Sequence, residues 1–397
     1  KRQALAAEPK LVEARELLAR LALEEHNAAK AIQEADKALA MSPEALEAMA
    51  LRATIDWLEE RPETPWLDRL LKINSAYGEA YATAARFFIL NRRYEEGIQF
   101  YQKALELNPR LWEARSQLGL NLMRLGRDQE ARRQLELCYD NGYQSDATVN
   151  SLRLLDSYAN FVFVKTGGGV LKLHKKEAEI LQPYFESQLA RAVETFERKY
   201  RMKLEQPVRV EVYPDHEDFA VRTLGMPGLG ALGVSFGPVV AMDSPSARRP
   251  GQYHWASTLW HELSHVFVLT ATRHRVPRWF TEGLAVYEET AVSPDWGDRL
   301  SPEIILAIRE NKLLPVAELD RGFVRPSFPA QVVVSYFQAG RMCGFIAQKW
   351  SYDKLLAMIE AFARRQSTPE TIEQVLGLKP AELDRQFRAW LEAETRK

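Results

Sequence analysis

The chain has 397 residues, of which 46% are hydrophobic and 27% are charged, so it can bury two or three separate cores. Its 53 basic and 54 acidic residues give a formal net charge of −1, which excludes a global field that favours DNA or anionic membranes. No apolar run reaches the length of a membrane-spanning helix, and the only two cysteines, Cys138 and Cys343, lie at packing positions of different predicted domains.

The first 145 residues contain a repeat. Turn markers of successive units are Pro9, Pro43, Ser75, Pro109 and Tyr143. Small residues recur in register with these markers and allow two helices to approach closely, so each unit is predicted to be a helix pair that stacks on its neighbours. Segment 94–109 resembles the tetratricopeptide repeat. We therefore predict an α-solenoid over residues 1–145, with a concave groove for a protein partner.

Two irregularities mark these repeats. The segment Arg61–Pro65 contains two prolines and is expected to break the second helix of the second unit. The chain opens in mid-repeat at Lys1, without an initiator methionine. We therefore expect a longer N-terminal portion to precede this sequence.

A mixed lobe is predicted in residues 146–301 and a helical lobe in residues 302–397, which makes the whole chain α+β and mostly α. Strands are expected at 161–164, 170–173, 208–213 and 234–242. A triple glycine, Gly167–Gly169, predicts the turn of a hairpin. A helix of about 25 residues is expected to end at Arg201. Pro238 argues against a central position for the last strand and favours an edge or a break.

The segment 253–272 predicts a largely buried helix, because it lacks proline and glycine and its apolar residues recur at helical spacing. It contains His261-Glu262-Leu263-Ser264-His265. Positions i and i+4 share one helix face, so His261 and His265 can present two imidazoles to one metal ion. Glu262 lies beside them and can act as a base without ligating. A buried charged triplet is costly unless a cation compensates it.

The third ligand decides the class of metal site. A metzincin would carry glycine and histidine where this chain has Val268 and Ala271. Glu282 lies in a second predicted helix, 279–290, and two histidines plus one carboxylate leave a fourth zinc position open for water. The rival carboxylates Glu288 and Glu289 lie nearly two turns further and are expected at the exposed end of that helix.

The two motifs together, His-Glu-x-x-His and Trp-x-x-Glu-Gly-x-Ala, resemble those of the gluzincin metallopeptidases, particularly bacterial peptidase MA-like domains found beside helical repeats. The resemblance covers about residues 170–365. It implies that Zn²⁺ is held by His261, His265 and Glu282. It further implies that Glu262 is the general base and that Tyr336 donates a hydrogen bond to the oxyanion. A tyrosine on an apolar helix is otherwise a packing residue.

The resemblance also predicts how substrate binds. In gluzincins an edge strand just before the zinc helix pairs with the extended substrate backbone, a form of strand addition. The matching residues here are Val239, Val240, Ala241 and Met242. An ordinary core strand is the alternative interpretation of this segment.

One departure from the family pattern affects the metal site. Several gluzincins carry, one turn after the ligand glutamate, an acidic residue that orients the first histidine, but this chain has Val286 there. Such partners fix the tautomer and ring orientation of a ligand. Either another group, with Asp243 and Asp295 as candidates, takes this role, or the site binds metal less tightly.

The leading functional hypothesis is a zinc-dependent metallopeptidase, an endopeptidase by preference, whose repeats recruit a peptide or protein substrate or a partner protein. One alternative is a catalytically degenerate peptidase-like scaffold. Another is an aminopeptidase, although the sequence lacks a Gly-Ala-Met-Glu-Asn-like segment for a free amine. No nucleic-acid partner is expected. The resemblance favours a bacterial envelope, periplasmic or secreted location.

Overall fold

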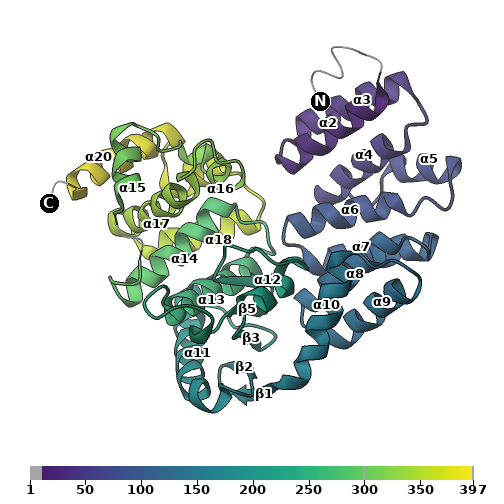
Figure 1. Cartoon of the computed structure of the whole chain (residues 1–397). Helices are drawn as coiled ribbons and strands as arrows, with labels where there is room; N and C mark the ends of the chain where they lie inside the picture. The colour runs from purple at the N-terminus through teal and green to yellow at the C-terminus, as the bar shows by residue number, and fades with distance from the viewer. Residues whose placement is uncertain (1–10, 298–299, 396–397) are drawn as a thin grey trace. The chain divides into compact units, whose positions relative to one another are not determined.

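The computed structural model describes residues 11–297 and 300–395. The chain divides into two compact units (Figure 1), the first made of Lys1–Asp156 with Leu224–Met226 and the second of Ser157–Thr223 with Pro227–Lys397. The turn marker Pro9 and the chain start lie outside the described residues. Within the described part, no helix combines the length and the apolar character that crossing a membrane requires.

The first unit is a series of antiparallel helix pairs (Figure 1). Its helices are α2 (Val12–Glu24), α3 (Ala28–Met41), α4 (Leu46–Leu58), α5 (Pro65–Ile73), α6 (Glu79–Leu90), α7 (Tyr94–Leu107), α8 (Trp112–Arg124), α9 (Asp128–Asp140) and α10 (Asp146–Ser157). The markers Pro43, Ser75, Pro109 and Tyr143 lie in the turns between pairs. Helix α5 is short because the proline-containing segment delays its start until Pro65.

Small residues bring paired helices into close contact. A Cβ atom at Gly97 of α7 would lie 2.5 Å from Ile89 Cδ1 of α6. A Cβ atom at Gly119 of α8 would lie 2.7 Å from Leu135 Cγ of α9. The structure thus confirms helical repeats in which small residues allow close approach.

The second unit is built around a five-stranded mixed sheet with the order β1-β2-β3-β5-β4. The strands are β1 (Phe161–Thr166), β2 (Gly169–His174), β3 (Val208–Tyr213), β4 (Gly233–Phe236) and β5 (Val239–Asp243). Strands β2, β3 and β5 are parallel, whereas β1 and β4 pair antiparallel with β2 and β5. The predicted single strand 234–242 is therefore two strands, because Gly237 (φ +60°) and Pro238 form a tight turn.

Helices cover both faces of this sheet. Helix α11 (Ala178–Tyr200) links β2 to β3, α12 (His216–Leu224) follows β3, and α13 (Trp255–Ala271) follows β5. Val210 and Val240 lie in the same apolar core as Phe185 of α11 and Leu263 of α13. The opposite face carries charge, and the buried carboxylate of Glu211 accepts a hydrogen bond of 2.7 Å from Arg222 Nε on α12.

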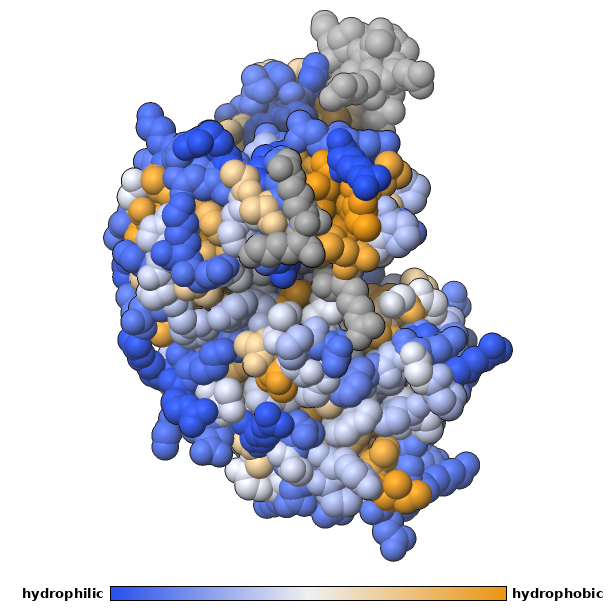
Figure 2. Space-filling model, turned by 90° about the vertical axis from the view of Figure 1, so that its left-hand side faces the viewer, coloured by the Kyte–Doolittle hydropathy of each residue, from blue (hydrophilic) through white to orange (hydrophobic). Residues whose placement is uncertain are grey.

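Helices complete the second unit after the sheet. They are α14 (Arg278–Val292), α15 (Pro302–Arg309), α16 (Asp320–Val324), α17 (Gln331–Lys349), α18 (Tyr352–Ala363), α19 (Thr368–Leu376) and α20 (Pro380–Thr395), with the 3₁₀ segment η3 (Val316–Glu318) before α16. Two further 3₁₀ segments lie earlier in the chain, η1 (Tyr158–Asn160) before β1 and η2 (Pro245–Ala247) between β5 and α13. Figure 2 shows mainly hydrophilic residues on the face that it presents, interrupted by apolar side chains. The α+β, mostly α fold class is confirmed.

Candidate metal centre

Helix α13 presents two histidines on one face, close to its middle. Its apolar residues Leu259, Leu263 and Phe267 are fully buried and fix the rotation of the helix against the core. His261 and His265 are one turn apart, and their ring centroids are 4.8 Å from each other. The Nε2 atoms of the two rings lie 3.2 Å apart.

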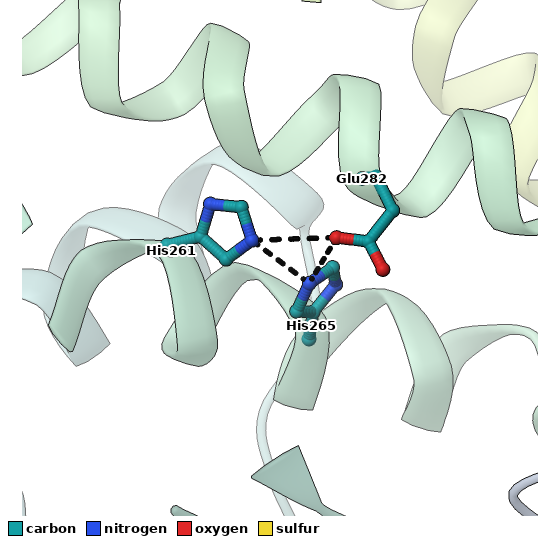
Figure 3. Close-up of side chains that lie close together, drawn as sticks. All are labelled: His261, His265 and Glu282. Atoms are coloured by element: carbon teal, nitrogen blue, oxygen red, sulfur yellow. Dashed lines mark hydrogen bonds and ion pairs between the residues drawn. The ribbon is translucent and has the colours of Figure 1, made fainter. Parts of the chain in front are cut away.

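Helix α14 supplies a carboxylate to the same point (Figure 3). Glu282 Oε2 lies 3.1 Å from His265 Nε2 and 3.4 Å from His261 Nε2. The next residue, Gly283, packs against α17, and a Cβ atom there would lie 2.5 Å from the Ala339 carbonyl oxygen. Glycine at this position therefore allows the close helix contact that holds α14, and with it Glu282, in place.

The three ligand atoms fit a tetrahedral metal ion. Bonds of about 2.0–2.1 Å in a tetrahedral site separate neighbouring ligand atoms by roughly 3.3–3.4 Å. The three separations here, 3.1, 3.2 and 3.4 Å, are close to that value. Among the residues that the structure describes, His261, His265 and Glu282 form the one cluster of histidine, cysteine or acidic residues with metal-site spacing.

The far nitrogens of the two histidines are also held. His261 Nδ1 lies 2.7 Å from Glu289 Oε1, and because an ionised carboxylate can only accept, the proton of this ring is placed on Nδ1. His265 Nδ1 lies 2.8 Å from Thr281 Oγ1, which can accept from the same position. These partners direct both Nε2 lone pairs toward Glu282, as in metal sites whose histidines are oriented through their second nitrogen.

The electrostatic environment favours a cation. Burial alone would lower the pKa of His261, but contacts with Glu282 and Glu289 and the charge of Glu262 raise that pKa well above its usual value. The carboxylates therefore attract positive charge to this point, and a divalent ion satisfies them without protonating a ligand.

Glu262 lies next to the histidines and close to the sheet. Its side chain is largely buried, and Gly233 at the start of β4 packs against it. A Cβ atom at Gly233 would lie 2.9 Å from Glu262 Cγ and 3.2 Å from its Oε1. The backbone of β4 is thus placed directly beside the candidate base.

Helix α17 places Tyr336 near the same centre. The ring of Tyr336 lies 6.3 Å from that of His261 and meets Phe323 edge to face at 5.1 Å. Burial and the charges of Glu282 and Glu262 raise its pKa above the usual value. Its hydroxyl is therefore protonated at neutral pH and can donate a hydrogen bond.

Two comparisons with known families bear on this geometry. Residues 191–393 match the model of the peptidase MA superfamily, which covers just over half of the chain. The chain belongs to the peptidase MA superfamily. Residues 78–111 match the tetratricopeptide repeat. No curated protein matches the chain.

The structure of the peptidase MA domain corrects the prediction of which strand binds substrate. Residues Val239, Val240, Ala241 and Met242 belong to β5, which pairs with β3 on one side and β4 on the other. Its backbone is therefore used within the sheet and is unable to pair with a substrate. The edge strand is β4 (Gly233–Phe236). Sequence pattern alone predicts one strand here because the turn between β4 and β5 has only two residues.

The prediction of which acidic residue orients the first histidine is also wrong. Val286 packs against α17, where a Cβ atom at Gly340 would lie 2.5 Å from its Cγ1, so an acid there would face a helix contact and not His261. Asp243 instead binds His216 and Arg248, and Asp295 lies on the exposed surface. Glu289, two turns after Glu282, contacts His261.

The remaining rival, Glu288, is also not at an exposed helix end. It is 1% exposed and accepts a hydrogen bond of 2.9 Å from the Tyr352 hydroxyl. Residues seven positions apart lie on the same face of a helix. The separation of Glu282 and Glu289 could therefore have indicated that Glu289 is the carboxylate that contacts His261.

Proposed function

We propose that the peptidase MA domain is a zinc-dependent peptidase of the gluzincin type. The close approach of three possible metal-ligand atoms, one each from His261, His265 and Glu282, supports this proposal most directly. The orientation of both histidines by Glu289 and Thr281 gives further support.

The residues divide the chemistry between them. A zinc ion held by the triad would supply an activated water and a Lewis acid for the scissile carbonyl. Glu262 accepts the proton of the attacking water and later delivers it to the leaving amine. The Tyr336 hydroxyl donates a hydrogen bond to the oxyanion of the tetrahedral intermediate.

Strand β4 offers a binding surface for the substrate backbone. Among the described strands it pairs only with β5 and forms one edge of the sheet. Its first residue, Gly233, contacts Glu262. An extended peptide added to this edge would run beside the base, and strand addition recognises backbone and not a chain terminus. We therefore favour endopeptidase over aminopeptidase activity.

We further propose that the repeats recruit a protein substrate or partner. A groove of about 590 Å³ is lined by α2, α4 and α6 within the first unit, and Leu17 in this groove is 38% exposed. Leu17→Glu is expected to slow cleavage of a protein substrate and to spare a short peptide. Leu137→Glu, a change at a leucine on α9 that is 45% exposed, is the control. Equal slowing by both variants contradicts recruitment by this groove.

The activity is tested by digesting an unbiased peptide library with the full chain. Zinc-loaded protein is expected to cleave internal bonds, chelated protein to lose this activity, and added zinc to restore it. Release of N-terminal residues alone would favour an aminopeptidase. Stoichiometric zinc without any cleavage would favour the degenerate scaffold and overturn the proposal.

A further inference from the structure

Ser257 lies one turn before His261 on α13 and makes a contact that the proposed chemistry does not yet use. Its side-chain hydroxyl donates a hydrogen bond to Oε2 of Glu289 on α14. The other oxygen of that carboxylate, Oε1, lies 2.7 Å from His261 Nδ1. Glu289 therefore joins Ser257 to a candidate metal ligand, with one carboxylate oxygen for each partner.

The spacing along α13 places Ser257 on the same face as the two histidines. Ser257, His261 and His265 follow one another at intervals of four residues, and such positions share one face of a helix. Glu282 contacts His265 and His261 from α14. Seven residues further along α14, Glu289 contacts His261 and Ser257. Ser257 thus extends the row of interhelical contacts that begins at the metal centre.

The first turn of α13 holds Ser257 in place and leaves its hydroxyl for Glu289. The backbone nitrogen of Ser257 donates a hydrogen bond of 3.1 Å to Nδ1 of His254, the residue that caps the helix. Serine within a helix often bonds the carbonyl oxygen four residues earlier, but for Ser257 that residue is Tyr253, which precedes α13. The hydroxyl therefore serves the neighbouring helix and not its own.

Both oxygens of a buried carboxylate need hydrogen-bond donors. The side chain of Glu289 is only 12% exposed, and among the described residues its donors are Ser257 and His261. An ionised carboxylate only accepts hydrogen bonds. Removal of the Ser257 hydroxyl would leave Oε2 without a donor, which is costly for a buried charge. The carboxylate would then be free to rotate away from His261 to regain a partner.

We propose that Ser257 is a positioning residue that fixes the rotation of the Glu289 carboxylate and thereby holds the His261 ring with its Nε2 lone pair at the metal site. The inference rests on the proposed zinc-dependent function. The nitrogen through which a histidine binds metal is set by the hydrogen bond that its other nitrogen makes. Ser257 therefore strengthens zinc binding without contacting the ion or the substrate.

A double-mutant cycle in the full chain tests this coupling through zinc affinity, measured by competition with a chelator. Ser257→Ala should weaken zinc binding by about 3–10-fold, the effect of one hydrogen bond. In the Glu289→Ala background the same change should cost less than about twofold, because the carboxylate that the hydroxyl holds is gone. Additive losses, or wild-type affinity in Ser257→Ala, overturn the proposal.

Two further variants separate the hydroxyl from general damage to α13. Ser257→Thr keeps a hydroxyl and should bind zinc more tightly than Ser257→Ala. Thr272→Val removes another buried hydroxyl, which donates to the Val268 carbonyl oxygen at 2.8 Å at the far end of the helix, and it should leave zinc affinity unchanged. Equal losses in Ser257→Ala and Thr272→Val, or in Ser257→Ala and Ser257→Thr, would show an effect of packing and overturn the proposal.

A spectroscopic measurement makes the test independent of affinity. In the zinc-loaded chain, proton–nitrogen correlation spectra of the histidine side chains report the proton on each Nδ1. Ser257→Ala should shift the His261 signal and speed exchange of its proton with water. The His265 signal, whose Nδ1 lies 2.8 Å from Thr281 Oγ1, should stay in place. Shifts of both signals, or of neither, overturn the proposal. A wild type that binds zinc but cleaves no peptide would defeat the proposed function and still test Ser257.

Discussion

The repeats and the peptidase domain use the same packing device for different purposes. In the repeats, Gly97 allows α6 and α7 to approach, and its nearest neighbour is the end of the Ile89 side chain. In the peptidase domain, Gly283 allows α14 and α17 to approach, and its neighbour is the Ala339 backbone. The first contact only brings apolar side chains together. The second also sets the position of Glu282, so a packing residue there controls a charged site.

The largest loss of activity is expected when a charged side chain of the peptidase domain is substituted. Glu262→Gln removes a proton acceptor and keeps the shape, so hydrolysis of a short peptide should fall by about 10²–10⁴-fold while zinc content is retained. Steady-state kinetics and elemental analysis measure both quantities. Glu303→Gln, at an exposed position on α15, is the control. Wild-type activity in Glu262→Gln would show that another group is the base.

The orienting contact should have the next largest effect. Glu289→Ala leaves His261 without its Nδ1 partner, so zinc affinity should fall by about 10–100-fold in competition with a chelator. Asp295→Ala, which removes an exposed acid of the same region, should leave the affinity unchanged. Equal affinities for Glu289→Ala and the wild type would remove Glu289 from the metal site.

A change in strand β4 tests whether the sheet edge and the base are coupled. Gly233→Ala places a methyl group 2.7 Å from Thr258 Cγ2 and 2.9 Å from Glu262 Cγ, so both side chains must shift. We expect kcat to fall by about tenfold while zinc is retained, because no ligand moves. An unchanged kcat would show that Glu262 does not depend on β4.

The smallest effects concern packing and compare the two regions directly. Gly283→Ala should destabilise the peptidase domain by about 1–3 kcal/mol, since its Cβ would meet backbone that is unable to move aside. Gly97→Ala should change the stability of the repeats by less than about 1 kcal/mol, because the two atoms nearest the new Cβ belong to the Ile89 side chain, which can rotate, while the Ala85 carbonyl oxygen lies at 3.1 Å, and because alanine favours a helix. Denaturant unfolding measures both, and equal costs would contradict the difference between the two regions.

Local patterns allowed much of this molecule to be predicted. Each of the two motifs, the i,i+4 histidines and Glu-Gly, lies within one helix, so its spacing alone shows which side chains share a helix face. The structure places His261, His265 and Glu282 at one point. The repeats were predictable because successive turn markers lie 32 or 34 residues apart. The catalytic role of Tyr336 stays a prediction, although the structure places it beside the triad.

What the sequence left open depends on contacts between distant elements. The position of β5 inside the sheet follows from pairing with β3, about thirty residues earlier in the chain, and not from its own composition. Position 286 faces α17, where Val286 packs. The acid that contacts His261 is therefore Glu289 and not a residue at position 286.

Zinc binding itself tests the central claim most directly. Purified protein is analysed for metal content and by X-ray absorption at the zinc edge, together with Glu282→Ala. The account predicts one zinc per chain with two histidine nitrogens and a carboxylate oxygen as protein ligands, and a large loss of zinc in the variant. Full zinc content in Glu282→Ala, or a zinc shell without histidine, would contradict it.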